Sequence, residues 1–191
     1  MNKPFRTVES MLDFMRARGK APAIISYEGH VLQYEQLAVH IERTRTWLNR
    51  MGIGPNKRVA IVMPNGPEMA VSFLSVMASA TAAPLNFNYP ETEYRFYLDD
   101  LNADALIVPA GFETPAVKVA EELSVPVFRL ISHETGNGLF SLESDIPAET
   151  ATHSYTQPED IGMILHTSGT TSRPKIVPLP LLNLLTSAHN V

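Results

Sequence analysis

The fold of this chain is decided by a stretch near its end, Ile161-Gly-Met-Ile-Leu-His-Thr-Ser-Gly-Thr-Thr-Ser-Arg-Pro-Lys-Ile-Val-Pro178. It opens with a short apolar run, Ile161 to Leu165, whose length and composition predict a buried strand. Hydroxyl side chains and a single glycine follow, and the chain becomes apolar again after Lys175. Lys175 to Leu179 can therefore pair as a second strand, with a polar loop between the two.

This loop is rich in chemical groups that are suited to binding phosphate. Gly169 allows φ values that other residues resist, so successive backbone N–H groups can point at one anion. The hydroxyl side chains add further donors, and Lys175 supplies a full positive charge. The predicted phosphate-binding residues are Thr167, Ser168, Gly169, Thr170, Thr171, Ser172 and Lys175, with His166 and Arg173 as candidate neighbours of the ligand.

Two other interpretations of the loop are possible. An ordinary solvated loop has a similar content of Ser, Thr and Gly, so composition alone does not separate the two. A Walker A loop requires G-x-x-x-x-G-K-[ST]. That pattern is absent, because Gly169 has no second glycine and Ile176 follows Lys175.

The order of residues is more informative than their composition. The string Thr167-Ser-Gly-Thr-Thr-Ser-Arg-Pro-Lys175 resembles the phosphate-loop signature of the adenylate-forming (AMP-binding) superfamily, which includes acyl-CoA synthetases, firefly-type luciferases and the adenylation domains of peptide synthetases. Two positions depart from it. The family usually has glycine where this chain has Ile176, and it often has Thr-His where this chain has Pro180-Leu181.

The resemblance extends over nearly the whole chain. Residues 31–38, 58–68 and 82–86 are similar to earlier landmarks of the superfamily. Within it, the chain most resembles oxalate–CoA ligases, near the 4-coumarate–CoA ligase branch. The residues that carry this closer likeness are 80–86, 96–98, 166–175, 177–179 and 183–185.

The resemblance implies a reaction in two halves. A carboxylate attacks the α-phosphorus of ATP to give an acyl-adenylate and pyrophosphate, and a CoA thiol then attacks the activated carbonyl. It implies ATP, Mg²⁺ and CoA as cofactors of the full-length enzyme, and a small carboxylic acid as its substrate. The loop from Thr167 to Lys175 would bind the β- and γ-phosphates and steady the leaving pyrophosphate.

In the resembled family, several functional parts come later in sequence. They include the adenine and ribose contacts, the magnesium-coordinating acid and a mobile C-terminal domain with a second lysine. Residues 1–191 are therefore expected to be the N-terminal portion of the adenylation domain, without catalytic residues of their own. The isolated chain is expected to be inactive, because the rest of that domain and the C-terminal domain are missing.

Two alternatives remain open at this point. One is a non-catalytic nucleotide- or anion-binding α/β module that retains the loop. The other is an adenylation unit that passes its acyl group to a carrier-protein thiol. The coding sequence beyond Val191 would distinguish them, because only an enzyme needs the later adenylation motifs and only the second alternative needs a carrier domain.

Composition narrows the function classes further. The formal net charge of −5 argues against nucleic acid or a membrane as a partner. The absence of cysteine excludes disulfides, thiolate metal sites and cysteine nucleophiles. The six histidines lack metal-binding spacing, so no protein metal site is predicted. Without a secretory signal or a transmembrane run, an intracellular, cytoplasmic location is expected, or a peroxisomal one in a eukaryote.

Hydrophobic periodicity predicts alternating strands and helices. Such alternation indicates an α/β fold with a mostly parallel sheet covered by helices on both faces. Residues 132–158 lack clear periodicity and are expected to be mainly loop. Strands are predicted in a hairpin over 23–34 and at 58–64, 82–86, 105–109, 125–131, 161–165 and 175–179, and helices between Thr7 and Gly19, over 35–50, after Pro67, over 91–102 and 113–123, and from Pro180 onward.

Three smaller features have structural interpretations. The stripe Tyr94, Tyr97, Leu98 and Leu101 is expected to be core rather than a base-stacking platform. The pairs Asp99-Asp100 and Glu121-Glu122 are expected to be solvated surface. His166 could contact a ligand, but a hydrogen-bonded structural histidine at a strand end is favoured.

Overall fold

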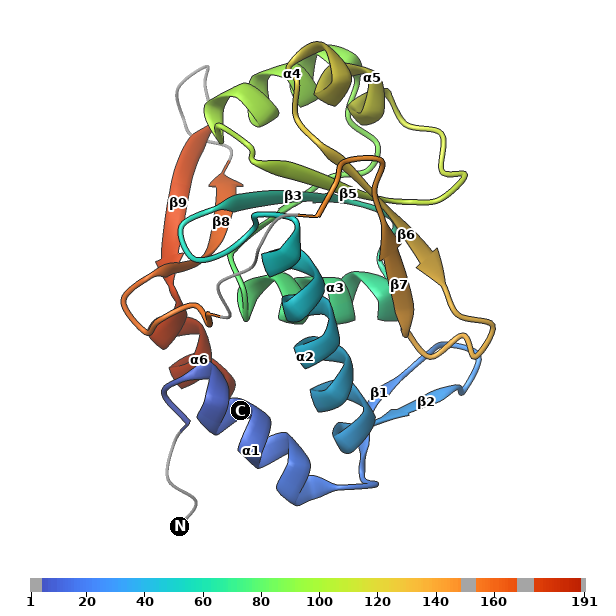
Figure 1. The fold of residues 1–191 in the computed structure, drawn as a ribbon, viewed down its shortest axis with the longest axis vertical. Helices are drawn as coiled ribbons and strands as arrows, with labels where there is room; N and C mark the ends of the chain where they lie inside the picture. Colours follow the sequence, from blue (N-terminus) through green and yellow to red (C-terminus); the bar gives the residue numbers. More distant parts are fainter. Residues whose placement is uncertain (1–4, 149–153, 168–173, 190–191) are drawn as a thin grey trace.

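The computed structural model describes residues 5–148, 154–167 and 174–189 (Figure 1). Its centre is a seven-stranded sheet in the order β7-β6-β5-β3-β4-β8-β9. The five inner strands are parallel, whereas β7 and β9 pair antiparallel at the two edges. The strands are β3 Arg58–Val62, β4 Thr81–Leu85, β5 Ala105–Pro109, β6 Val127–Ser132, β7 Phe140–Glu143, β8 Ile161–Thr167 and β9 Lys175–Pro180.

Helices cover both faces of this sheet, as predicted. β3 is followed by α3 (Pro67–Met77) and then by its neighbour β4, whereas α4 (Glu91–Asp100) carries the chain back past β3 to β5. Parallel crossovers are right-handed, so this reversal of direction places α4 on the face opposite α3. α5 (Pro115–Glu122) continues in the same direction and lies beside α4 (Figure 1).

The alternation of side chains along β3 links the two cores. Val59 and Ile61 pack into the larger core with α1, α2 and α3, while Ala60 and Val62 pack into the core beneath α4 and α5. All four side chains are fully buried. A parallel strand covered on both faces reads as a continuous hydrophobic run, and β3 has this pattern.

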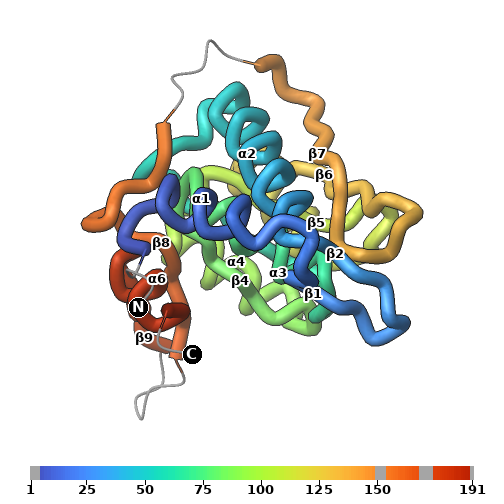
Figure 2. The backbone as a smooth tube through the Cα atoms, turned by 90° about the horizontal axis from the view of Figure 1, so that it is seen from below, coloured from blue at the N-terminus to red at the C-terminus, as the bar shows by residue number. Residues whose placement is uncertain are grey.

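The N-terminal part of the chain packs below the sheet. α1 (Val8–Arg18) is capped at its N-terminus by Thr7, whose side chain accepts a hydrogen bond from Ser10 N, and at its C-terminus by Gly19. The hairpin β1 (Pro22–Ile25) and β2 (Val31–Gln33) leads into α2 (Tyr34–Arg50). Figure 2 shows α1 beside α6 (Leu181–His189), and the rings of Phe5 and His189 meet edge to face at 5.9 Å.

A polar network fixes the segment that leads into β8. Tyr155 donates a hydrogen bond to Glu42, and the guanidinium of Arg45 lies 4.2 Å from the centre of the Tyr155 ring. Asn49 accepts from Ser154 N at 3.1 Å. Because three side chains of one helix hold two consecutive residues, the path into β8 is set by α2.

Residues 132–158, expected to be mainly loop, also contain the short strand β7, which the sequence pattern does not predict and which pairs antiparallel with β6. One prediction about secondary structure needs correction. Pro180 was expected to start the last helix, but it ends β9, and the helix starts at Leu181. The other elements lie where periodicity placed them, with ends that coincide or differ by at most three residues. None of the helices in the described ranges is long and apolar enough to cross a membrane.

Candidate functional site

The ends of the predicted phosphate loop are held by the β8–β9 hairpin. Thr167, the last residue of β8, pairs with Lys175, the first residue of β9, and both are exposed. The antiparallel ladder continues inward through the pair His166 and Ile176. Of the predicted loop residues, Ser168, Gly169, Thr170, Thr171, Ser172 and Arg173 lie outside the described residues.

The hairpin is placed where open α/β sheets bind ligands. β8 is parallel to β4, so its carboxyl end lies at the same edge of the sheet as the carboxyl ends of the other parallel strands. Ligands of such sheets usually bind outside this edge. The structure thus brings one predicted hydroxyl and the predicted lysine together at an edge suited to ligand binding.

His166 is the predicted neighbour that the structure explains best. Its Nε2 lies 3.3 Å from Oδ2 of Asp100, at the end of α4. Its ring packs against that of Tyr97, with centroids 4.5 Å apart and planes at 63°. These contacts agree with the favoured interpretation, a hydrogen-bonded structural histidine at a strand end.

The charge state of His166 follows from these contacts. Burial lowers its pKa below the ordinary histidine value, and the carboxylate of Asp100 opposes that shift without cancelling it. The imidazole is therefore neutral at physiological pH. A carboxylate can only accept, so the proton of the neutral ring resides on Nε2, which donates to Asp100.

Sequence reasoning missed the role of α4 in this site. Tyr97 is buried as predicted and Asp100 is exposed as predicted, but both also contact His166. Asp100 is 66 residues away in sequence, so no local pattern connects the two. The available signal was the position of Asp99 and Asp100, since carboxylates at a helix C-terminus are unfavourable unless they have a partner.

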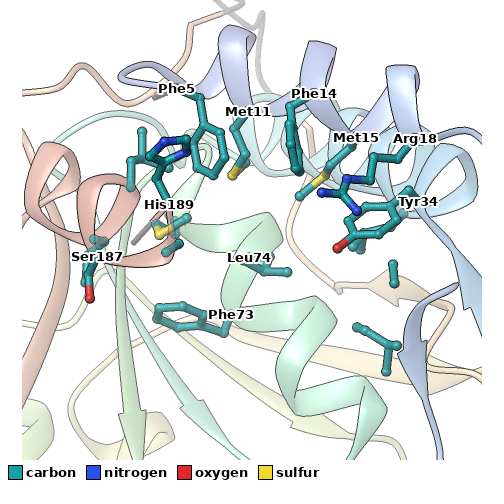
Figure 3. Close-up of a pocket in the computed structure, with 17 residues that line it drawn as sticks. Phe5, Met11, Phe14, Met15, Arg18, Tyr34, Phe73, Leu74, Ser187 and His189 are labelled. Atoms are coloured by element: carbon teal, nitrogen blue, oxygen red, sulfur yellow. The ribbon is translucent and has the colours of Figure 1, made fainter. Parts of the chain in front are cut away.

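One of the two larger cavities adjoins the site, and the other does not. One of about 760 Å³ lies between α4 and the end of the loop, and several carboxylates face it. Its lining residues are Thr92, Glu93, Phe96, Tyr97, Asp99, Asp100 and Pro174. The other, of about 790 Å³, is apolar and lies between α1, α3 and α6 (Figure 3). Its lining residues do not include any from β8 or β9.

Metal ligands were not predicted for this chain. Across residues 5–148, 154–167 and 174–189, no three His, Asp or Glu side chains come together in a way that could hold a metal ion. Mg²⁺ in nucleotide sites is usually held by the substrate phosphates and one or two carboxylates. An exposed lysine and a hydroxyl at the hairpin fit the phosphates rather than the metal.

The position of Ile176 gives a test of the departure from the family signature. It lies in β9 opposite His166, and 37% of its surface is exposed. A β-branched residue favours this extended backbone, whereas glycine is more costly to order. We expect Ile176→Gly to lower the free energy of unfolding by about 1 kcal/mol in chemical denaturation, and Ile176→Thr, which keeps the β-branch, to lower it less. Tighter pyrophosphate binding by the glycine variant would instead indicate that Ile176 strains the loop.

Known proteins resemble this chain in sequence over most of its length. It is 38% identical to an oxalate–CoA ligase of Arabidopsis thaliana over 164 residues, which cover 84% of this chain and 32% of the relative. It is 34% identical to an oxalate–CoA ligase of Saccharomyces cerevisiae over 161 residues, which cover 70% of this chain and 29% of the relative. The chain thus spans about a third of the length of these relatives.

The fold is also found in solved structures. A long-chain-fatty-acid–CoA ligase from Archaeoglobus fulgidus superposes with a TM-score of 0.76 at 22% identity, covering 99% of this chain and 39% of that one. The family model described as AMP-binding enzyme matches residues 13–191. Because this match spans nearly the whole sequence, the chain belongs to the AMP-binding enzyme family.

Proposed function

We propose that this chain is the triphosphate-binding portion of an ATP-dependent acid–CoA ligase, and that oxalate is the acid. The observation that carries the assignment is the pairing of Thr167 with Lys175 at the carboxyl edge of the sheet. It gives the two ends of the signature loop a fixed base, from which a hydroxyl and an ammonium can reach the same phosphate group. The names of the two oxalate–CoA ligases favour oxalate over other small acids.

The first half of the proposed reaction needs charge neutralisation more than proton transfer. An oxygen of the acid's carboxylate attacks the α-phosphorus of ATP, a new P–O bond forms, and the bond to the bridging oxygen breaks as pyrophosphate leaves. The attacking carboxylate is already ionised at neutral pH, so no general base is required. The barrier comes from negative charge on the triphosphate, which donors and cations aimed at its oxygens relieve.

The proposed role of this chain is limited to that relief of charge. Lys175 places its ammonium on the β- and γ-phosphates, and the hydroxyl of Thr167 donates to their oxygens. Mg²⁺, bound with the nucleotide, supplies further positive charge there. In the second half, the sulfur of CoA attacks the acyl carbon, the bond from that carbon to the AMP oxygen breaks, and AMP leaves. No residue of this chain is assigned to that step.

ATP–pyrophosphate exchange tests the assignment. We expect the full-length gene product to exchange pyrophosphate with oxalate and less with malonate or 3-hydroxybenzoate. The 191-residue chain alone should show no exchange, since the reactants are then neither oriented nor enclosed. Lys175→Ala in the full-length protein should lower the exchange rate by about 10- to 100-fold, the equivalent of one charge-assisted contact of about 1.5–3 kcal/mol.

A matched control separates the loop lysine from a general loss of charge. Lys118→Ala removes the same charge from α5, where Lys118 pairs with Glu91 on the surface, and should leave the exchange rate unchanged. Acid-dependent exchange by the 191-residue chain would contradict the proposal that this chain only binds the triphosphate and does not catalyse the reaction alone. Full-length protein that binds ATP but is silent with every acid would favour a nucleotide-binding module instead.

A further inference from the structure

The contact between β8 and α4 lies directly beside the base of the loop. His166 is followed by Thr167, and its pairing partner Ile176 is preceded in β9 by Lys175. Asp100 lies 3.3 Å from Nε2 of His166, and the ring of Tyr97 packs against the imidazole at 4.5 Å with the two planes inclined by 63°. The His166 side chain is only 5% exposed, compared with 37% for Asp100. A well-enclosed side chain thus adjoins the two exposed residues that are proposed to meet phosphate.

Tyr97, which contacts His166, is itself held in place by other packed side chains. Tyr97 stacks on Tyr89, with ring centroids 4.9 Å apart and planes inclined by 21°. Leu98, the next residue of α4, is buried in the core. The imidazole is therefore held by a helix that is anchored to the sheet, so a displacement of His166 requires repacking of that helix.

The end of α4 gives a second reason to assign a function to the contact. Asp99 and Asp100 form the last turn of the helix, where the carbonyl ends carry partial negative charge, and that turn has no basic residue. Two carboxylates at this end are unfavourable for the helix itself. Both carboxylates line the cavity beside Pro174, and Asp100 also gains a donor from His166, which offsets that cost.

We infer that His166 is a positioning residue for ATP: Asp100 and Tyr97 hold it so that Thr167 and Lys175, its neighbours in the hairpin, present their polar groups to the triphosphate from a fixed base. This role rests on the proposed ATP-dependent function.

Amide substitutions at His166 provide a sharp test in the full-length protein. The amide nitrogen of Gln reaches the position of Nε2, whereas that of Asn reaches only the position of Nδ1. We expect His166→Ala and His166→Asn to raise the KM for ATP and to weaken pyrophosphate binding about 10-fold, the equivalent of one hydrogen bond to a charged group. The KM for oxalate should change less than about 2-fold, because the hairpin is assigned to the triphosphate alone. His166→Gln should restore most of the ATP affinity.

Variants of the two neighbouring carboxylates supply the matched control. Asp100→Asn should weaken ATP binding and should add little to His166→Ala in the double variant, as expected for two groups that act through one contact. Asp99→Asn removes the same charge one residue away and should leave the KM for ATP unchanged.

ATP and pyrophosphate binding should be measured by calorimetry alongside exchange kinetics and thermal unfolding. Equal losses in all three His166 variants, in parallel with a lowered melting temperature, would reduce His166 to a packing role and overturn the inference. An active wild-type enzyme with unchanged KM for ATP in His166→Ala would overturn it while leaving the proposed function intact. Wild-type protein that binds neither ATP nor pyrophosphate would overturn both.

Discussion

Replacement of Gly138 by alanine is expected to lower the free energy of unfolding by about 3–4 kcal/mol. Gly138 has a φ of +97°, a conformation that side-chain-bearing residues resist. An added Cβ would lie 2.8 Å from Cβ of Pro67 and 2.9 Å from its carbonyl carbon and oxygen. The obstacle is the backbone at the start of α3, so it cannot move aside as a flexible side chain could. Left-handed backbone costs about 1–2 kcal/mol and overpacking about 1–3 kcal/mol, and the two add at this position.

Gly111 is the matched control for this prediction. Its φ is +73°, but an added Cβ would meet no atom within 4 Å. Gly111→Ala should therefore show the conformational cost alone, about 1 kcal/mol. Urea denaturation of both variants measures the difference directly. Equal losses at the two positions would mean that the contact with Pro67 relaxes and that the close approach of the two segments has no energetic consequence.

The layered α/β fold could be predicted from the sequence, whereas one of its edge strands could not. The apolar runs of the parallel strands and the amphipathic helices predict the fold, because burial on both faces leaves a strong local pattern. β7 was missed because its alternation, Phe140 and Leu142 in, Ser141 and Glu143 out, spans only four residues. So short a pattern becomes a strand only because β6 offers it an edge to pair with.

The candidate site was partly predictable for a similar reason. The loop residues are consecutive, so their chemistry and their resemblance to a family signature are both visible in one stretch. The supports of the loop are dispersed. Asp100 reaches His166 from 66 residues away, and Tyr155 reaches Glu42 from 113 residues away. Such contacts depend on how the helices pack against the sheet, and the hydrophobic periodicity of a sequence does not specify that packing. In the described part of the chain, therefore, the sequence indicates the groups proposed to touch phosphate, and the structure adds the residues that hold them.

His40 provides a large predicted dependence of stability on pH. Burial, reinforced by the nearby charges of His133 and Arg43, lowers the pKa of His40 from its ordinary value of 6.5 to about 4. The ring packs edge to face on Phe140 at 4.4 Å, and its Nε2 has no hydrogen-bond partner among the described residues. The folded protein thus accepts the proton at a much lower pH than the unfolded chain does.

The sign of the effect follows from proton uptake. As pH falls from about 7 to about 4, the unfolded chain protonates this histidine while the folded protein keeps it neutral, so acid favours unfolding. Above pH 6.5 the histidine does not lower the free energy of unfolding, whereas by pH 4 a pKa shift of this size lowers it by about 3 kcal/mol.

Urea denaturation at pH 7, 6, 5 and 4 should show this loss of stability in the wild-type protein, in addition to the loss from all other titrating groups. His40→Leu keeps an apolar side chain against Phe140 without a titrating group, so its stability should fall by about 3 kcal/mol less over the same range. Parallel pH profiles for the two proteins would show that His40 is hydrated or hydrogen-bonded in solution and is not a buried neutral ring.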